Sequence, residues 1–240
     1  MAWNYNQQVA APQPQRLPHK TIAILLPHRD NWYAEFVEAT WGPLKYQPTD
    51  WCNKMYFLAR VPSLPLSRNN LVAEFLKSPA EYCFWLDSDV IPHTPPNPND
   101  AMKILYSTLE STGESIATGL YRAKQVHGFN WSIWKQVNLP GGKVSFTNLP
   151  GWPEGVNWFT VDVAGAGCLM MHRRVFEAMR DAGIKNYFHW EEPGSMSEDF
   201  HMLTEAKKLG FSTWCRSDVQ FSHMGTLVVD PDGGFRVPRV

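Results

Sequence analysis

Two aspartates follow a short apolar run in the segment YCFWLDSDVIP (82–92), and their spacing suggests metal chemistry. Asp87 and Asp89 are one residue apart, so in an extended backbone both carboxylates point the same way. A hard cation held by only one or two carboxylates keeps coordination positions for phosphate oxygens. Such a cation neutralises charge as a bond to a diphosphate breaks. The alternative is that Asp87 ends a strand and Asp89 forms a turn.

Two later segments carry side chains that could complete such a site. SEDF (197–200) places Glu198 and Asp199 in the first turn of an expected helix, where a carboxylate could act as a general base. We expect the helix dipole to favour the ionised form of Asp199 and keep its pKa low. A later apolar run ends in His223, a residue type that binds metals. The alternatives are an ordinary acidic helix start and a structural histidine.

The elements that must position these residues alternate between strands and helices, which predicts an α/β domain with right-handed crossovers. Residues 122–160 are rich in Trp, Gly, Pro and Asn and predict short antiparallel strands or a large loop insertion. Strands are expected at 21–26, 54–60, 81–87, 115–121, 161–172, 212–217 and 219–223. Helices are expected at 31–41, from a Ser67 cap to Lys77, from an Asp100 cap to about Ser111, at 173–183 and at 197–210.

Length and composition limit the number of domains and the classes of partner that the protein can have. The 240 residues are enough for one domain, and 22 Lys and Arg against 23 Asp and Glu give a net charge of −1, so nothing indicates a strongly basic nucleic-acid binder. We expect residues 1–19 to be a flexible arm and not a signal peptide, and 224–240 to be a mobile tail. Buried free thiols are expected, in a cytoplasmic protein without a membrane helix. The four cysteines are Cys52, Cys83, Cys168 and Cys215.

The order of these motifs resembles glycosyltransferases of the GT-A fold, most closely family 2 and its soluble bacterial and phage relatives. The likeness spans about residues 20–225 and rests on SRNNLVAEFL before FWLDSDV, then GAGCLMM, SEDF and a strand ending in His223. It implies a mixed Rossmann-type sheet flanked by helices in one fused domain. The nucleotide-binding half would be about 20–121 and the acceptor half about 122–223. It also implies transfer of a sugar from a nucleotide-sugar, a UDP-sugar being favoured, to a hydroxyl, with Mn²⁺ or Mg²⁺ as cofactor.

The resemblance also assigns roles to individual residues. Asp199 would be the base of an inverting enzyme, with Glu198 beside it. The metal ligands would be Asp87, Asp89 and His223, and Asp87 would also hold ribose or sugar. The nucleotide and its diphosphate would contact Pro27, His28, Arg29, Asp30, Arg68 and Asn69. The acceptor would border Gly165, Ala166 and Gly167.

Several alternatives stay open at this stage. A retaining transferase would need no base at Asp199. A nucleotidyltransferase is disfavoured because PHRDNW (27–32) lacks the glycines that cradle a triphosphate, and a non-catalytic nucleotide- or sugar-binding module also remains. Arg68 could be a solvent-exposed helix residue, and Gly165–Gly167 could serve close packing. The sequence lacks the Gln-x-x-Arg-Trp element of processive family 2 members, which disfavours a polymerising synthase.

The acceptor is the least constrained part of the prediction. A glycan, a small molecule, a protein or a modified DNA base would all supply a hydroxyl. A DNA acceptor would need a basic groove with aromatic side chains. Trp131 and Trp134 could stack on a ring, although at least one of them is expected in the core. The basic candidates are Arg122, Lys124, Lys135, Lys143, Arg173 and Arg174.

Overall fold

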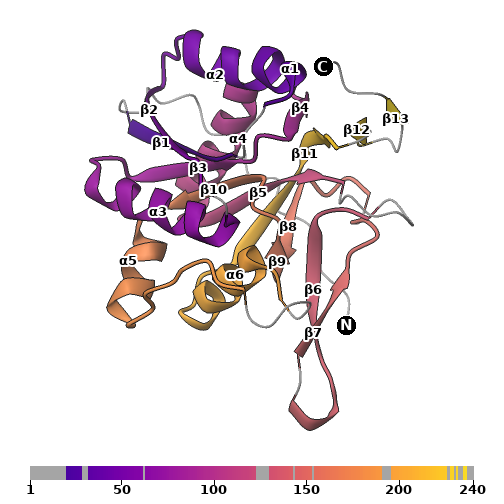
Figure 1. Cartoon of the computed structure of the whole chain (residues 1–240). Coiled ribbons are helices and arrows are strands. Elements are labelled where there is room, and N and C mark those ends of the chain that lie inside the picture. Colours follow the sequence, from indigo (N-terminus) through magenta and orange to yellow (C-terminus); the bar gives the residue numbers. More distant parts are fainter. Residues whose placement is uncertain are drawn as a thin grey trace.

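A computed structural model describes most of the chain and shows a central sheet with helices on both faces (Figure 1). The described residues are 20–28, 32–61, 63–122, 130–142, 144–152, 154–190, 196–225, 228–229, 231 and 235–236. The expected arm at 1–19 therefore lies outside them, as do Arg29, Asp30, Lys124 and Lys143.

The main sheet is mixed, and its first three strands along the chain pair in parallel. The strand β1 (Lys20–Pro27) pairs in parallel with β2 (Cys52–Ala59) on one side and with β3 (Tyr82–Leu86) on the other. Next, β10 (Cys168–His172) runs antiparallel between β3 and β5 (Ile116–Tyr121). The observed fold confirms the expected mixed α/β sheet flanked by helices.

The carboxyl ends of β3, β5 and the long strand β11 (Thr213–His223) are the ends that carry the candidate residues. The pairing of β11 with β5 is parallel. One short strand that the sequence did not suggest, β4 (Val90–Thr94), pairs antiparallel with the last residues of β11. Because β4 follows the two aspartates directly, this pairing brings Asp89 beside His223.

Two apolar layers hold the helices to the sheet, and strand residues alternate between them. In β3, for example, Cys83 and Trp85 face one layer while Phe84 and Leu86 face the other. Figure 1 shows the two groups of helices on opposite sides of the sheet. One layer is covered by α3 (Leu64–Lys77), α5 (Arg174–Asp181) and α6 (Glu198–Lys208). The other is covered by α4 (Pro98–Thr112) and the continuous helical segment α1 (Ala34–Phe36), η1 (Val37–Trp41) and α2 (Gly42–Tyr46).

Two helix starts differ from the expected ones. The helix α3 begins at Leu64 and not after Ser67, because Pro65 fits a first helical turn; Ser67 is buried and its hydroxyl donates to the carbonyl of Ala59. The helix α4 is capped by Asn97, whose side chain accepts from the amide of Asn99, and not by Asp100. Asp100 lies in the first turn of that helix instead.

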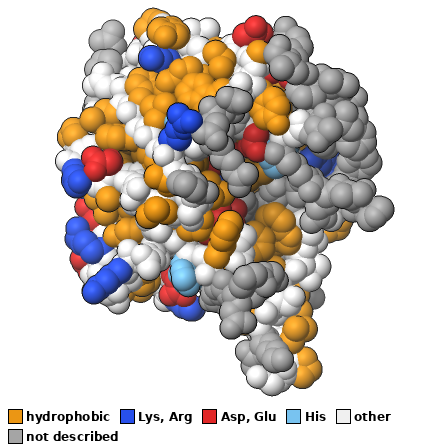
Figure 2. Space-filling view, in the orientation of Figure 1, with side chains coloured by type: hydrophobic (Ala, Val, Ile, Leu, Met, Phe, Trp, Pro, Cys, Tyr) orange, Lys and Arg blue, Asp and Glu red, His pale blue; other side chains and the backbone are white. Residues whose placement is uncertain are grey.

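Residues 122–160 contain short antiparallel strands, which is the first of the two expected alternatives, the other being a large loop insertion. A hairpin of β6 (Ile133–Asn138) and β7 (Val144–Asn148), joined by the 3₁₀ turn η2 (Pro140–Gly142), pairs with β9 (Val163–Ala164). The strand β8 (Trp158–Val161) pairs with the first half of β11. The hairpin projects from the body (Figures 1 and 2) and its exposed side chains include Val137, Leu139 and Val144.

The cysteines, the tail at 224–240 and the lengths of the helices were also subjects of expectation. The four cysteines are buried and free, as expected. Within the expected mobile tail, β12 (Val228–Val229) pairs with the end of β11, and β13 (Phe235–Arg236) pairs with β12. In the described part of the chain, no helix has the length and apolar character needed to cross a membrane.

Candidate active site

Arg68 is the centre of the candidate site, and its side chain is almost fully buried. Its Nη1 donates to Oε1 of Glu198 at 3.0 Å, and its Nη2 donates to both oxygens of Asp87 at 3.0 and 3.1 Å. A buried arginine is rare unless it is paired, and here three elements supply the pairing: α3, the end of β3 and the start of α6. With a side chain only 2% exposed, Arg68 is not the solvent-exposed helix residue of the alternative interpretation, and its contact with a diphosphate stays a prediction.

Glu198 holds this arginine in place, and each of its two carboxylate oxygens accepts a hydrogen bond from a neighbouring side chain. Its Oε1 accepts from Arg68, and its Oε2 accepts from Nε1 of Trp190 at 2.6 Å. The residue is 5% exposed. The geometry therefore favours a positioning role for Glu198, and the expectation that it belongs to the catalytic residues beside Asp199 stays a prediction.

Asp199, the expected base, points toward the Gly-Ala-Gly segment. Its Oδ2 accepts from the amide of Ala166 at 3.3 Å, and its Oδ1 accepts from the amide of Phe200 at 2.9 Å and from the Ser197 hydroxyl. The expectation of a low pKa is wrong: burial raises the pKa of Asp199, Arg68 counteracts it, and the charge of Glu198 raises it again. A raised pKa makes the carboxylate a stronger proton acceptor.

The segment between β9 and β10 is built on close packing against Tyr121, the last residue of β5. The amide of Gly167 donates to the Tyr121 hydroxyl at 3.1 Å. A Cβ atom at Gly165 would lie 2.0 Å from that hydroxyl oxygen, so only glycine fits there. The close-packing interpretation therefore holds for Gly165 and Gly167, and the same packing points the Ala166 amide at Asp199. A border with the acceptor stays a prediction.

Asp89 and His223, two of the three expected metal ligands, lie side by side as a candidate metal-ligand pair. His223 Nε2 lies 3.7 Å from Asp89 Oδ2, and His223 Nδ1 lies 2.7 Å from the carbonyl oxygen of Arg122. A bond from Nδ1–H to that carbonyl directs the Nε2 lone pair toward Asp89, which is the arrangement that orients metal-binding histidines. The amide of Met224 also donates to the Asp89 carbonyl at 2.7 Å and fixes the two segments together.

Asp87, the third expected ligand, is turned toward Arg68. Among the described residues, no group of three or more His, Cys, Asp or Glu side chains is arranged to hold a metal ion. A two-residue set still fits Mg²⁺ or Mn²⁺, because such ions are commonly bound by one or two protein side chains together with substrate phosphates. The residues present therefore fit a cation whose remaining ligands come from a diphosphate.

The electrostatic balance of this region is strongly negative. The carboxylates of Asp87, Glu198 and Asp199 act on one guanidinium, that of Arg68, and a fourth carboxylate, that of Asp89, acts on Asp87. Burial raises the pKa of Asp87; the charge of Arg68 counteracts this, and that of Asp89 adds to it. Burial lowers the pKa of Arg68, but the neighbouring carboxylates raise it further than burial lowers it. The arginine thus stays charged, and the excess negative charge favours a cation.

Of the remaining predicted residues, the structure describes Pro27, His28 and Asn69. Pro27 ends β1, and the amide of His28 donates to the carbonyl of Ala59 at 3.0 Å. Asn69 does not face open space: its side chain exchanges two hydrogen bonds with the backbone of Phe188, at 2.7 and 3.1 Å. Asn69 thereby anchors the segment that carries Trp190.

Sequence reasoning missed two residues of this region. Tyr121 contacts the glycine segment, and its ring packs edge-on against His223 with centroids 5.1 Å apart. Burial and the charges of Asp87 and Asp199 raise its pKa. The signal was its place at the carboxyl end of a predicted strand, where α/β sheets bind ligands. Trp190, the partner of Glu198, lies in an irregular segment that gave no signal.

Comparison with solved structures identifies the class of fold: the chain has a GT-A-like fold. One match is to GalNAc-T7, solved with UDP, GalNAc and Mn²⁺, at 8% identity and a TM-score of 0.56, covering 86% of this chain and 43% of that chain. A second match, to A197 from STIV, has 15% identity and a TM-score of 0.59 and covers 92% of this chain and 94% of that chain. At such identities the likeness concerns the fold alone. No protein-family model matches the sequence, and no curated protein matches it significantly, so membership of family 2 stays a prediction.

Proposed function

We propose that this protein is a metal-dependent glycosyltransferase that moves a sugar from a nucleotide-sugar, with a UDP-sugar favoured, to a hydroxyl acceptor. The observation that carries the proposal is the gathering of four carboxylates, one buried arginine and one oriented histidine at the carboxyl ends of the sheet strands. Open α/β sheets bind their ligands at that edge. The GT-A-like fold supports the proposal, and GalNAc-T7, which shares it, was solved with UDP and Mn²⁺.

Asp89 and His223 are the residues that would hold Mn²⁺ or Mg²⁺. When bound, the cation would neutralise the charge that develops on the departing diphosphate. Asp87 keeps its orientation because Arg68 binds both of its oxygens. Asp87 remains partly accessible, with 24% of its side chain exposed, and it can accept hydrogen bonds from ribose or sugar hydroxyls.

Asp199 is the proposed general base of an inverting reaction. It would accept the proton of the acceptor hydroxyl while that oxygen attacks the anomeric carbon and the diphosphate leaves from the opposite face. The hydrogen bond from the Ala166 amide to Oδ2 of Asp199 is long, at 3.3 Å, so Oδ2 can still accept a proton. Replacing Asp199 with Asn should lower the transfer rate roughly 10²–10⁴-fold while donor binding survives.

The alternatives make different predictions for the same variant. If Asp199→Asn transfers sugar at nearly the native rate, Asp199 is not the base. Proton NMR of the product then decides the stereochemistry, because retention of the anomeric configuration would replace the inverting mechanism by a retaining one. Donor binding without any release of nucleoside diphosphate would indicate a non-catalytic binding module.

A modified DNA base receives little support as acceptor. Two of its expected basic contacts are used elsewhere: the Arg173 guanidinium donates to the carbonyls of Leu76, Ser78 and Ala80, and Arg174 binds Ser115. Trp131 is buried with Arg122 over its ring at 3.8 Å, which confirms that at least one tryptophan of 127–136 belongs to the core. A glycan, small-molecule or protein hydroxyl is therefore favoured over DNA.

The first experiment is a donor screen by thermal shift, with UDP-, GDP-, CMP- and dTDP-sugars, each with and without Mn²⁺. A ligand that binds the folded state raises the melting temperature by mass action. One class of nucleotide-sugar should raise the melting temperature of the native protein, and it should do so only with Mn²⁺ present. Asp89→Asn should abolish that increase. Asp181→Asn, at an exposed aspartate on α5, is the matched control. The proposal fails if no donor stabilises the protein and none is hydrolysed.

A further inference from the structure

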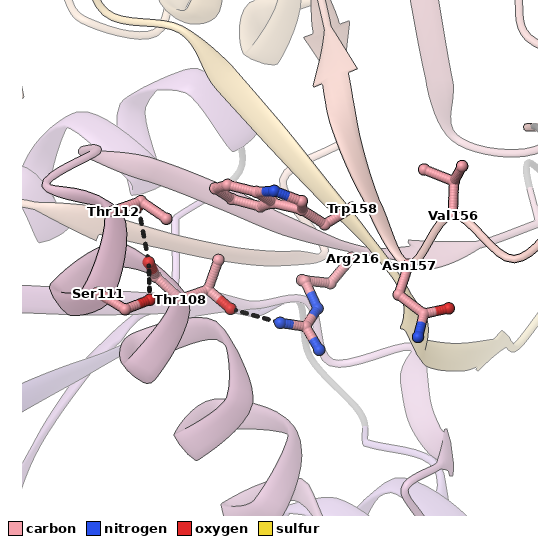
Figure 3. A pocket seen from close by; sticks show the side chains of 7 residues that line it. All are labelled: Thr108, Ser111, Thr112, Val156, Asn157, Trp158 and Arg216. Atoms are coloured by element: carbon pink, nitrogen blue, oxygen red, sulfur yellow. Dashed lines mark hydrogen bonds between the residues drawn. The ribbon is translucent and has the colours of Figure 1, made fainter. Parts of the chain in front are cut away.

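An open pocket of about 470 Å³ lies well away from the candidate active site, between α4, β8 and β11 (Figure 3). Its lining includes the aromatic ring of Trp158 and the polar side chains of Thr108, Ser111, Thr112, Asn157 and Arg216. Arg216 precedes His223 by seven residues along β11. At about 3.3 Å per residue, this places the pocket roughly 20 Å from the metal-ligand pair.

The tryptophan of this pocket is held rigidly. The rings of Trp158 and Trp214 are stacked, with centroids 3.9 Å apart and planes inclined by 19°. Because Trp214 does not line the pocket, the pocket contacts the remaining surface of the Trp158 ring. A fixed, half-buried indole offers an apolar surface that costs little conformational entropy when a ligand packs on it.

Hydrogen bonds also hold two of the polar side chains around it, those of Arg216 and Thr108, and the pocket carries little net charge. Arg216 Nη1 donates to the Thr108 hydroxyl at 2.8 Å, and Arg216 Nε donates to Asp218 at 2.8 Å. Figure 3 shows the Thr108–Arg216 bond below the Trp158 ring in this view, with Asn157 beyond Arg216. Arg216 is the one charged residue among the described side chains that line this pocket, and Asp218 offsets its charge.

We infer that this pocket is a binding site for a neutral saccharide unit, separate from the proposed donor and acceptor sites. The C–H face of a sugar ring packs on an indole, and its hydroxyls need a few fixed donors and acceptors nearby. Asn157 is exposed on the loop before β8 and offers both a donor and an acceptor. A phosphate-bearing ligand would find no unmatched positive charge here, which disfavours nucleotides. The inference does not depend on the proposed transferase activity.

The test is saturation-transfer NMR on the full chain with a panel of methyl glycosides: glucoside, galactoside, mannoside and N-acetylglucosaminide. Binding is then quantified from the shifts of the indole N–H signals. At least one glycoside should bind with millimolar affinity, Trp158→Ala should weaken it at least tenfold, and Asn157→Ala should weaken it about threefold. Tyr46→Ala removes an aromatic ring that is 74% exposed on α2 and should leave binding unchanged.

Two controls keep the outcome decisive. If Trp158→Ala fails to fold, Trp158→Phe and Asn157→Ala replace it, and both must weaken binding. Excess UDP with Mn²⁺ separates this pocket from the candidate active site, since the glycoside signal should persist when the nucleotide is added. The inference is overturned if no glycoside binds, if binding survives every pocket variant, if UDP displaces the glycoside, or if uridine binds at Trp158 and the glycosides do not.

Discussion

Replacing Arg68 with Met tests whether the buried arginine organises the candidate site. Methionine fills a similar volume but leaves Asp87 and Glu198 without their shared cation. Removing one partner of a buried ion pair typically costs about 3–5 kcal/mol. We expect the lower end, about 3 kcal/mol, because Glu198 keeps the Trp190 hydrogen bond and the Asp87 side chain is 24% exposed to water.

Urea unfolding measures this cost directly. With a denaturant slope of about 3 kcal/mol per molar, a loss of about 3 kcal/mol lowers the unfolding midpoint by about 1 M. Lys77→Met is the matched control on the same helix, because Lys77 pairs with Glu74 at the surface and its side chain is 71% exposed. That pair should contribute less than about 1 kcal/mol.

The cost should also depend on pH in a defined direction. Arg68 lowers the pKa of Asp87 against the effect of burial, so removing Arg68 raises that pKa further. The deficit of Arg68→Met is therefore largest above the new pKa of Asp87, where the carboxylate must ionise without a cation, and it shrinks as the pH falls through that pKa. Adding Glu198→Gln to Arg68→Met should recover part of the loss. Equal midpoints for Arg68→Met and Lys77→Met at pH 7 would refute the reasoning.

Three further outcomes follow from the same geometry. Asp89→Ala should abolish Mn²⁺ binding measured by calorimetry, while His223→Ala should weaken it less; full Mn²⁺-stimulated turnover in Asp89→Ala would exclude the metal site. Gly165→Ala should destabilise the protein by about 1–3 kcal/mol in urea because its Cβ would lie 2.0 Å from the Tyr121 hydroxyl, and Gly151→Ala, which meets no atom within 4 Å, should not. The acid limb of the pH–rate profile should lie above the ordinary aspartate pKa and move to lower pH in Glu198→Gln, because the Glu198 charge raises the pKa of Asp199; an unmoved limb would show that another group titrates.

The sheet was predictable from sequence where its strands are continuous apolar runs. The run at 82–86 is buried on both faces, as a central strand requires. The sequence did not reveal β4, because Pro92 within it argues against a strand, yet an edge position tolerates proline. The two expected final strands are one strand, β11, whose register with β5 shifts between Cys215 and Gln220. A bulge of this kind interrupts the apolar alternation and makes one strand resemble two.

The members of the candidate site were largely predictable, but their mutual contacts were not. Asp87, Asp89, Asp199 and His223 follow from strand-end and helix-start positions. The burial of Arg68 does not, because it depends on Glu198, a partner 130 residues away. Local patterns indicate which element a residue lies on, whereas the choice between a solvent-exposed and a buried arginine is made by tertiary packing. The same limit explains why Asn69 contacts the backbone of Phe188 and not open space.

The error about the Asp199 pKa points to how this site differs from an ordinary helix start. A helix dipole favours an ionised carboxylate at an exposed N-terminus. Here burial and the neighbouring Glu198 and Asp87 charges outweigh the opposing effects of Arg68 and of the Ser197 hydrogen bond, and the pKa of Asp199 rises. Since the folded-state pKa values of Asp87 and Asp199 are raised, the stability linked to them is complete below the ordinary aspartate pKa and is lost as the pH rises through the raised values. At neutral pH these carboxylates therefore lower the stability of the fold, which is understandable if they are retained for binding a cation and accepting a proton.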